Sequence, residues 1–483
     1  MNVHSRRRHV LAALFVLLFA LSQALLWLAY YGNGAKPLIG DEANYQANAL
    51  AILAGGAWMP GTIWPPLQSL FIALVYALCG PHLLAIQLAQ TVLFVACAAL
   101  LRDLWRRIGG SVAAANTAAA LFLLNPGTAA YAQWLWPEIP HLFLLLAALS
   151  LLARAASPLR ASVAGACIGL AILAKSLLSV FWPAFLIAFV RRGRSSFAWR
   201  SALGFVLGIG LLTAPALLHG WRTYGTPMIA DSSIYNLWVG LTDRWRSDYV
   251  EDMGGVTLPA FLASAATPQQ RNAVYLDKVR ALVAERGVVV TLADQFGRQY
   301  FRLFSAKTPL LSQLPGPACA GHLSVYRTPP WLTRTLTAAN DLLHALTLAA
   351  AAFGFVCWRW RAARRQNTVA TRPRSLKGRA LEFVLTASSN PLFVVIVLLL
   401  GYQLALFALI HVKARFLLPM LPFLCGFAGS FLAAWRVRPS GCNEAAIAWT
   451  PLRLGAGALL AAVLLFLAFG GPALDRLCAG QVA

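Results

Sequence analysis

Long apolar runs are the feature of this sequence that most limits how the chain can fold. A membrane-spanning helix needs about 20 consecutive, mostly apolar residues, and many apolar runs in the 483 residues approach or exceed that length. Only 12% of the residues are charged, whereas soluble domains average about 25%. The sequence therefore predicts an all-α polytopic membrane protein.

The apolar runs divide into about eleven expected transmembrane helices. The first, 10–31, follows three arginines and resembles a signal peptide, but its apolar part is long enough for an uncleaved anchor. The run 67–80 is short, and we expect it to be a juxtamembrane helix outside the membrane. The other expected spans include 82–101, 111–124, one that begins at 138, the hairpin 161–174 and 177–190, 201–218, 342–358, 391–410, one that begins at 416, and 454–469.

The positive charge indicates orientation. The net charge is +24, and in this topology 23 of the 40 Lys and Arg residues fall in short cytoplasmic segments. Arg191–Arg194 and the strongly basic Arg359–Arg379 are examples. Because cytoplasmic loops are enriched in Lys and Arg, we expect a cytoplasmic N-terminus and no nucleic-acid partner. An Arg-rich N-terminus without an organelle signal favours a bacterial inner membrane.

One long polar segment divides the chain. We expect residues 1–219 to form an N-terminal membrane module with catalytic external loops, 220–339 a larger periplasmic loop or cap, and 340–483 the C-terminal transmembrane helices. Within the cap, 269–285 has helical spacing. Its predicted apolar face consists of Val274, Val279, Leu282 and Val283.

An acidic pair directly after the first span is the strongest functional candidate. Asp41 and Glu42 open a predicted short helix on the external side, and ionisable residues at membrane depth are functional candidates by default. On a helix Asp41 and Tyr45 share one face, whereas Glu42 points about 100° away. Taken alone, the pair also fits a solvated helix cap.

Three further candidates lie at the same predicted face of the membrane. Glu138 stands at the mouth of a span, where it could also be only a helix cap. Lys175 is at the tip of a hairpin, where a lysine can simply extend its ammonium group to water. His411–Arg415 is a basic external corner, and phosphate suits it because arginine matches phosphate oxygens with paired donors.

Several common chemistries have no motif in this sequence. It contains no GxxxxGK[ST], HExxH or GxSxG pattern, so nucleotide hydrolysis, zinc proteolysis and serine-elbow catalysis are unsupported. The eight cysteines are scattered without CxxC or zinc-type spacing. We therefore expect no disulfide framework and no structural metal.

A series of short motifs resembles a known superfamily in type and in order. The motifs are Gly40-Asp41-Glu42-x-x-Tyr45, Pro65-Pro66-Leu67, Trp136-Pro137-Glu138, Ala174-Lys175-Ser176, Arg222-x-x-x-Gly225-x-Pro227, Tyr235-Asn236-Leu237-Trp238-Val239-Gly240 and Ala414-Arg415-Phe416-Leu417-Leu418-Pro419. Together they resemble the GT-C membrane glycosyltransferases, especially the aminoarabinose-transferase and protein-mannosyltransferase group. The resemblance covers about residues 1–425, with departures at Pro65, Glu138 and Ser176.

The resemblance implies a GT-C fold and an inverting transfer of a sugar from a polyprenyl phosphate to an acceptor hydroxyl at the periplasmic side. The acceptor would be a lipid, a glycan or a protein. No nucleotide cofactor is implied, because the donor is already activated on its lipid, and a divalent cation near the carboxylates is left open. The implied catalytic residues are Asp41 as general base, Glu42 and Glu138, and the implied substrate-binding residues are Tyr45, Lys175, Arg222, His411 and Arg415.

Two other functions fit part of the pattern. A transporter or flippase of lipid-linked sugars would also have many spans and basic sites, but such proteins often contain internal repeats and broken helices at the midplane. The candidate charges here gather at one face, and the two halves show no convincing repeat. A polysaccharide ligase or polymerase would share the polyprenyl donor and stays open as a second alternative.

Overall fold

We analysed a computed structural model of the chain. It describes residues 3–32, 36–38, 40–154, 157–190, 197–242, 253–306, 329–358, 390–436, 450–471 and 473. In these ranges the regular elements are helices, apart from isolated β-bridge residues, among them the pair Val190 and Phe197. The predicted basic segments Arg191–Arg194 and Arg359–Arg379 lie outside the described residues.

The N-terminal part alternates long and short helices. Its elements are α1 (Val3–Tyr31), α2 (Asp41–Leu53), α3 (Leu67–Cys79), α4 (Leu83–Arg107), α5 (Val112–Leu124), α6 (Pro126–Ala130), η1 (Tyr131–Gln133), α7 (Glu138–Leu152), α8 (Pro158–Ala174), η2 (Ser176–Leu178), η3 (Trp182–Phe189) and α9 (Trp199–Tyr224).

The remaining elements belong to the polar segment and to the C-terminal part. They are α10 (Ser233–Thr242), α11 (Met253–Ala263), α12 (Pro268–Arg286), α13 (Val288–Arg298), η4 (Tyr300–Leu303), α14 (Pro330–Cys357), α16 (Pro391–Phe407), η5 (Ala414–Leu417), α17 (Leu421–Arg436), α18 (Pro451–Leu465) and η6 (Phe466–Gly470).

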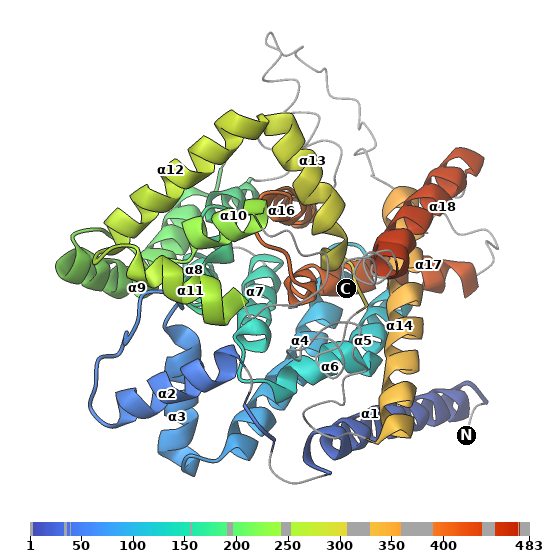
Figure 1. The fold of residues 1–483 in the computed structure, drawn as a ribbon. Helices are drawn as coiled ribbons and strands as arrows, with labels where there is room; N and C mark the ends of the chain where they lie inside the picture. Colours follow the sequence, from blue (N-terminus) through green and yellow to red (C-terminus); the bar gives the residue numbers. More distant parts are fainter. Residues whose placement is uncertain are drawn as a thin grey trace.

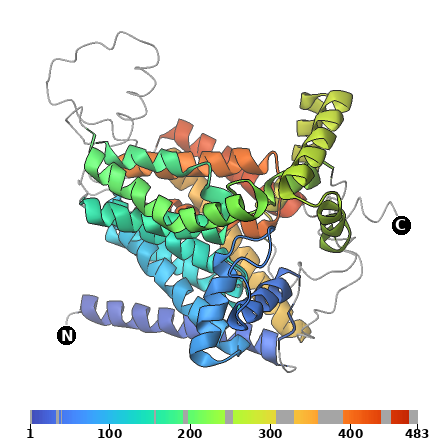
Figure 2. The same ribbon diagram turned by 90° about the vertical axis from the view of Figure 1, so that its left-hand side faces the viewer.

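Neighbouring helices form a bundle with the short helices at its margins. In Figure 2, α7, α8 and α9 (teal and green) run side by side, and α12 (yellow-green) projects from the end of the bundle away from the N-terminus. Figure 1 shows α12 and α13 meeting at an angle along the upper rim, with α16 close to them. The external cap of the prediction is therefore a set of helices at one end of the bundle.

Glycines bring α8 and α9 close together. A Cβ atom at Gly165 would lie 1.9 Å from the carbonyl oxygen of Phe205, and one at Gly208 would lie 2.1 Å from that of Ser162. Both helices carry the spacing Gly-x-x-x-Gly, at 165–169 and 204–208. Small residues at this spacing let membrane helices approach until their backbones touch.

The structure confirms the prediction of an all-α polytopic membrane protein. Among the described residues, five helices are long and apolar enough to cross a membrane, or six if α6–η1 and α7, which bend by 110°, form one broken span. Other apolar helices, such as α5, α8 and α16, are shorter than 18 residues. The expected total of about eleven spans therefore stays a prediction.

In two of the predicted spans, the observed secondary structure differs from the expected α-helix. The second arm of the hairpin, 177–190, consists largely of the 3-10 segments η2 and η3 instead of an α-helix. In a continuous α-helix over 177–190, Pro183 would lie in the interior and could not donate an N–H, whereas in the structure it stands in the first turn of η3, where no such bond is needed. The span expected from 416 begins as an α-helix only at Leu421, because η5 and the turn around Pro419 come first.

The cap helix was predicted in the right place but with a partly wrong inner face. The expected helix 269–285 is α12, and Val279 is buried as predicted. Val274 is instead 38% exposed, and the inward positions are completed by Tyr275 and Arg271. Two helices cross the predicted segment boundaries, because α9 extends past 219 and α14 begins at Pro330. The division into three segments stays a prediction.

Candidate active site

A cavity of about 420 Å³ lies where several segments that were predicted to be external meet. Its wall is formed by α2, the start of α7, the turn after α8, α10, and the chain from the end of α16 to η5. Six of the eight predicted site residues line it: Asp41, Tyr45, Glu138, Lys175, His411 and Arg415. Segments separated by more than 370 residues in sequence thus contribute to one site.

Asp41 enters the cavity from the first turn of α2. Gly40 precedes it with φ of 59°, a left-handed conformation that glycine adopts without steric cost. The chain can therefore turn sharply into the helix. The Asp41 side chain is 32% exposed, and its Oδ2 accepts a 2.9 Å hydrogen bond from Nη2 of Arg415. Tyr45 lies one turn further and also lines the cavity, as predicted for a shared face.

Glu138 is the second carboxylate of the cavity. It begins α7 and is almost completely buried. Its Oε1 accepts a 3.1 Å hydrogen bond from Nζ of Lys175 and lies 3.6 Å from Nε of Arg415. Arg415 therefore contacts both carboxylates. Its guanidinium also lies 4.5 Å from the ring centre of Trp136, a cation–π contact.

The surrounding charges fix the ionisation of the cavity groups. Burial would raise the pKa of the Asp41 carboxyl, but Arg415, Lys413 and Lys175 outweigh it and hold the pKa below its ordinary value. Asp41 is therefore an ionised carboxylate at neutral pH. Burial lowers the pKa of Lys175 and the nearby Arg415 lowers it further, against the opposing effect of Glu138.

His411 lines the cavity without adding positive charge. Burial and the neighbouring cations Lys413, Arg302 and Arg415 hold its pKa well below the ordinary value. The imidazole is therefore neutral at neutral pH and can contribute hydrogen bonds only. Lys413, which the sequence analysis placed in the basic corner but not among the site residues, also lines the cavity.

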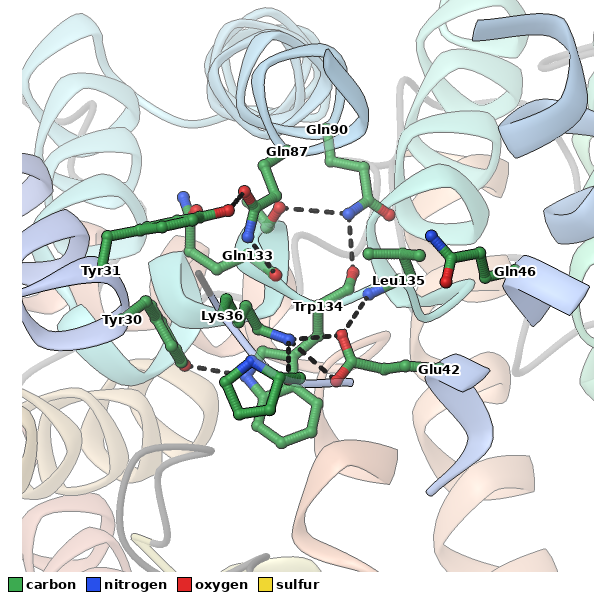
Figure 3. Close-up of polar contacts among 12 residues, drawn as sticks. Tyr30, Tyr31, Lys36, Glu42, Gln46, Gln87, Gln90, Gln133, Trp134 and Leu135 are labelled. Atoms are coloured by element: carbon green, nitrogen blue, oxygen red, sulfur yellow. Dashed lines mark hydrogen bonds and ion pairs between the residues drawn. The ribbon is translucent and has the colours of Figure 1, made fainter. Parts of the chain in front are cut away.

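Glu42 lies behind the cavity. Its carboxylate is fully buried and forms an ion pair with Lys36, whose Nζ lies 2.7 and 2.8 Å from the two carboxylate oxygens (Figure 3). Oε1 also accepts a 3.0 Å hydrogen bond from the amide of Leu135. The Lys36 ammonium lies 4.7 Å from the ring centre of Trp134. Glu42 thus ties α2 to the segment that precedes Glu138 and does not reach the cavity.

Two glutamines of α4 hold the same segment from the other side (Figure 3). Gln90 donates to the carbonyl oxygens of Ala132 and Trp134 at 3.1 and 2.6 Å, and Gln87 donates to that of Gln133 at 2.9 Å. These buried carbonyls belong to an irregular stretch that forms few backbone hydrogen bonds of its own, so side chains must satisfy them. The network fixes the chain just before Trp136 and Glu138.

Arg222 does not line the cavity. It lies exposed in the last turn of α9, where a cation is favoured by the helix dipole. Lys36 and Trp136 also belong to the site's framework, and neither was predicted to have a role there. Lys36 pairs with Glu42, and Trp136 contacts Arg415. Because Trp136 and Arg415 are far apart in sequence, no local pattern predicts their contact.

The cavity therefore combines two carboxylates, Asp41 and Glu138, with three cations, Lys175, Lys413 and Arg415. Such a site can accept a proton at Asp41 and can hold an anion with the cations. Among the described residues, no three His, Cys, Asp or Glu side chains come together as ligands for a metal ion.

Comparison with known proteins gives one family match. Residues 64–219, about a third of the chain, match the family model described as dolichyl-phosphate-mannose-protein mannosyltransferase. The predicted resemblance to GT-C membrane glycosyltransferases is confirmed. The matched part contains Glu138 and Lys175, and Asp41 and Arg415 lie outside it. A search of curated proteins gives no match.

Three solved structures align with the chain at low similarity. The oligosaccharyltransferase AglB from Archaeoglobus fulgidus, with an inhibitory peptide and a dolichol-phosphate, is 11% identical with a TM-score of 0.42, over 97% of this chain and 55% of AglB. ArnT from Cupriavidus metallidurans bound to undecaprenyl phosphate is 15% identical with a TM-score of 0.37, over 93% and 87% of the two chains. Apo ArnT is 16% identical with a TM-score of 0.36, over 87% and 78%. The chain thus spans about half the length of AglB, and at these scores we draw no conclusion from the alignments.

Proposed function

We propose that this protein transfers a sugar from a polyprenyl phosphate to an acceptor hydroxyl, in the cavity around Asp41. The observation that carries the proposal is the pairing of two carboxylates with Lys175 and Arg415 in one cavity. The family match to dolichyl-phosphate-mannose-dependent mannosyltransferases supports a lipid-phosphate donor. The acceptor class is a lipid, a glycan or a protein.

In this proposal Asp41 is the general base. The oxygen of the acceptor hydroxyl attacks the anomeric carbon, its proton passes to the Asp41 carboxylate, and the bond from the anomeric carbon to the phosphate oxygen breaks. The electron pair of that bond stays on polyprenyl phosphate, and the configuration at the sugar inverts. Asp41 suits the role because the neighbouring cations keep it ionised.

The leaving phosphate requires positive charge where its negative charge develops. Arg415 and Lys175 supply that charge, with Lys413 close by. In the structure Arg415 and Lys175 are hydrogen-bonded to Asp41 and Glu138, respectively. A donor phosphate that takes over these hydrogen bonds would release Asp41 for proton transfer. Glu138 then orients Lys175 and Arg415.

The proposal places the reaction at the periplasmic side of a bacterial inner membrane, with the N-terminus in the cytoplasm. The basic residues of the short predicted cytoplasmic segments support this orientation. No nucleotide is needed as a cofactor, because the sugar is already activated on its lipid carrier.

A transfer assay with two matched variants tests the function. Membranes containing the wild type, Asp41→Asn or Asp277→Asn receive undecaprenyl-phosphate donors with a radiolabelled sugar, and donor consumption and labelled product are measured. Asp277 is an exposed carboxylate of α12, ion-paired with Arg280. We expect Asp41→Asn to lower transfer by roughly 10²-fold or more, and Asp277→Asn to leave it unchanged.

The same assay separates the alternatives. Donor that crosses the bilayer without being consumed, equally in all three proteins, would contradict the transferase and favour a flippase. Transfer that survives Asp41→Asn would show that Asp41 is not the base. A product that grows by repeated addition of a glycan would indicate the ligase or polymerase.

A further inference from the structure

Helix α13 has its polar and apolar faces reversed relative to a helix on a water-exposed surface. Thr291, Gln295 and Gln299 follow one another at intervals of four and are buried. The opposite face contains Val289, which is 80% exposed, and Phe296, which is 47% exposed. Val290, Ala293 and Gly297 complete that face, so it carries no charged or polar side chain.

The buried polar face is held by hydrogen bonds to the cavity wall. Gln295 Nε2 donates to the carbonyl oxygen of Ile410 at 2.8 Å, and Gln299 Nε2 donates to that of Gly240 at 3.0 Å. Gln299 Oε1 accepts from the amide of Val412 at 3.4 Å. The orientation of α13 is therefore fixed, and the apolar face points outward because the polar face is bonded inward.

The end of α13 contacts a second strongly apolar helix, α16. Tyr300, just beyond α13, donates from its hydroxyl to the carbonyl oxygen of Leu404 near the end of α16, at 3.1 Å. α16 is strongly apolar, and Leu398 and Leu409, on and just after it, are 40% and 44% exposed. The end of α13 therefore lies against α16, and the exposed side chains on both helices include large apolar ones.

The preceding helix shows that the reversal is specific to α13. α12 is joined to α13 through Gly287 and meets it at an angle on the rim (Figure 1). Its outward face carries the charged residues Asp277, Lys278 and Arg280, and its buried face includes Tyr275 and Val279. This is the pattern of a helix that faces water. Two consecutive helices of the cap therefore face different surroundings.

We propose that the outer face of α13 lies in the external leaflet of the lipid bilayer, as an interfacial helix beside α16. Interfacial helices lie in the membrane plane with the apolar face about 5–10 Å into the boundary of headgroups and acyl chains. An 11-residue apolar helix is too short to span the membrane but suits this position.

The contact has a consequence for the cavity. Through Gln295 and Gln299, α13 holds the chain at Ile410–Val412, which leads directly to Lys413 and Arg415. Lipid around α13 therefore supports the position of the cationic corner. The inference concerns the membrane contact of α13 and does not depend on the proposed sugar transfer.

Lipid photolabelling of the full-length protein tests the contact. The protein is placed in phosphatidylcholine–phosphatidylglycerol nanodiscs that contain a lipid with a diazirine on its acyl chain, irradiated, digested and mapped by mass spectrometry. The positive control is α18, an apolar helix long enough to span with η6, and the negative control is the exposed face of α12. We expect label at Val289 and Phe296 within about threefold of α18 and at least tenfold above α12.

Label on α18 but only the α12 level on α13 would overturn the proposal. Cross-links between two copies of Phe296→Cys with a bis-maleimide would also overturn it and assign the face to a second copy of the chain. The consequence for the cavity is tested with Phe296→Asp and its matched control Val274→Asp, an exposed valine of α12. We expect faster hydrogen exchange at 410–415 only in Phe296→Asp; equal exchange in both variants would contradict the coupling.

Discussion

Arg415 is the residue on which the charges of the cavity converge. It hydrogen-bonds Asp41, lies 3.6 Å from Glu138 and packs over the ring of Trp136. Without the neighbouring cations, burial would raise the pKa of Asp41. The cations lower this pKa instead, so the carboxylate is ionised and can accept a proton. In the proposed transfer, one arginine thus serves the base before the reaction and the leaving phosphate during it.

Removal of a neighbouring cation should shift the pH dependence of the reaction. Lys413 lowers the pKa of Asp41 without the hydrogen bond that Arg415 makes. In Lys413→Met the pKa of Asp41 rises, so the carboxylate is protonated earlier as pH falls. We expect the acid limb of kcat/KM to move to higher pH. Lys278→Met, which removes a cation of the outer cap helix, should leave the limb in place; an unshifted limb in Lys413→Met would contradict Asp41 as the base.

The Lys36–Glu42 pair should matter for stability because both side chains are fully buried. Lys36→Met leaves Glu42 as an unpaired buried carboxylate, and removal of one partner of such a pair costs about 3–5 kcal/mol. The double variant Lys36→Met/Glu42→Gln carries no buried charge and keeps an oxygen for the Leu135 amide. We expect it to recover most of the lost stability in thermal or denaturant unfolding in detergent. Equal losses in both would show that the charge is not the cause.

At the scale of elements, the contact between α8 and α9 should be intolerant of even one methyl group. A Cβ atom at Gly208 would lie 2.1 Å from a backbone oxygen, whereas Gly210 on the same helix has open space. Overpacking typically costs about 1–3 kcal/mol. We therefore expect Gly208→Ala to lower the unfolding midpoint and Gly210→Ala to leave it unchanged or raise it. Equal effects would contradict the close packing.

The sequence predicted elements where local pattern decides, and failed where distant contacts decide. The short helix from Asp41 and the cap helix around Val279 were placed correctly because acidic residues in a first turn and helical periodicity are local signals. The inward position of Arg271 in the cap helix was missed, because a charged residue is buried there only by its ion pair with Asp231. Residues 177–190 were expected to be an ordinary span, although Pro183 interrupts the hydrogen bonding.

At the scale of the whole molecule, the same distinction applies to the site. Asp41, Glu138 and Arg415 could be named from charges at predicted membrane edges, and the fold brings them to one cavity. Arg222 was named from the family resemblance and lies elsewhere, because a short motif at a predicted membrane edge gives the face of the membrane but not the position on that face. The partner of Glu42 could not be foreseen, since pairing with Lys36 requires the exact path of the connecting loop.

The orientation of the bundle provides the last prediction. α4 has 25 residues, so at about 1.5 Å per residue its ends lie on opposite sides of the membrane. Asn44 is exposed on α2, near the start of α4, and Arg106 is exposed at its end. If the cavity faces the periplasm, a membrane-impermeant maleimide should label Asn44→Cys in intact cells, and Arg106→Cys only after permeabilisation. Both variants are made in a background in which all eight native cysteines are replaced by serine, because Cys79 is exposed and Cys319, Cys442 and Cys478 lie outside the described residues. The reverse labelling pattern would place the cavity in the cytoplasm and contradict transfer at the periplasmic side.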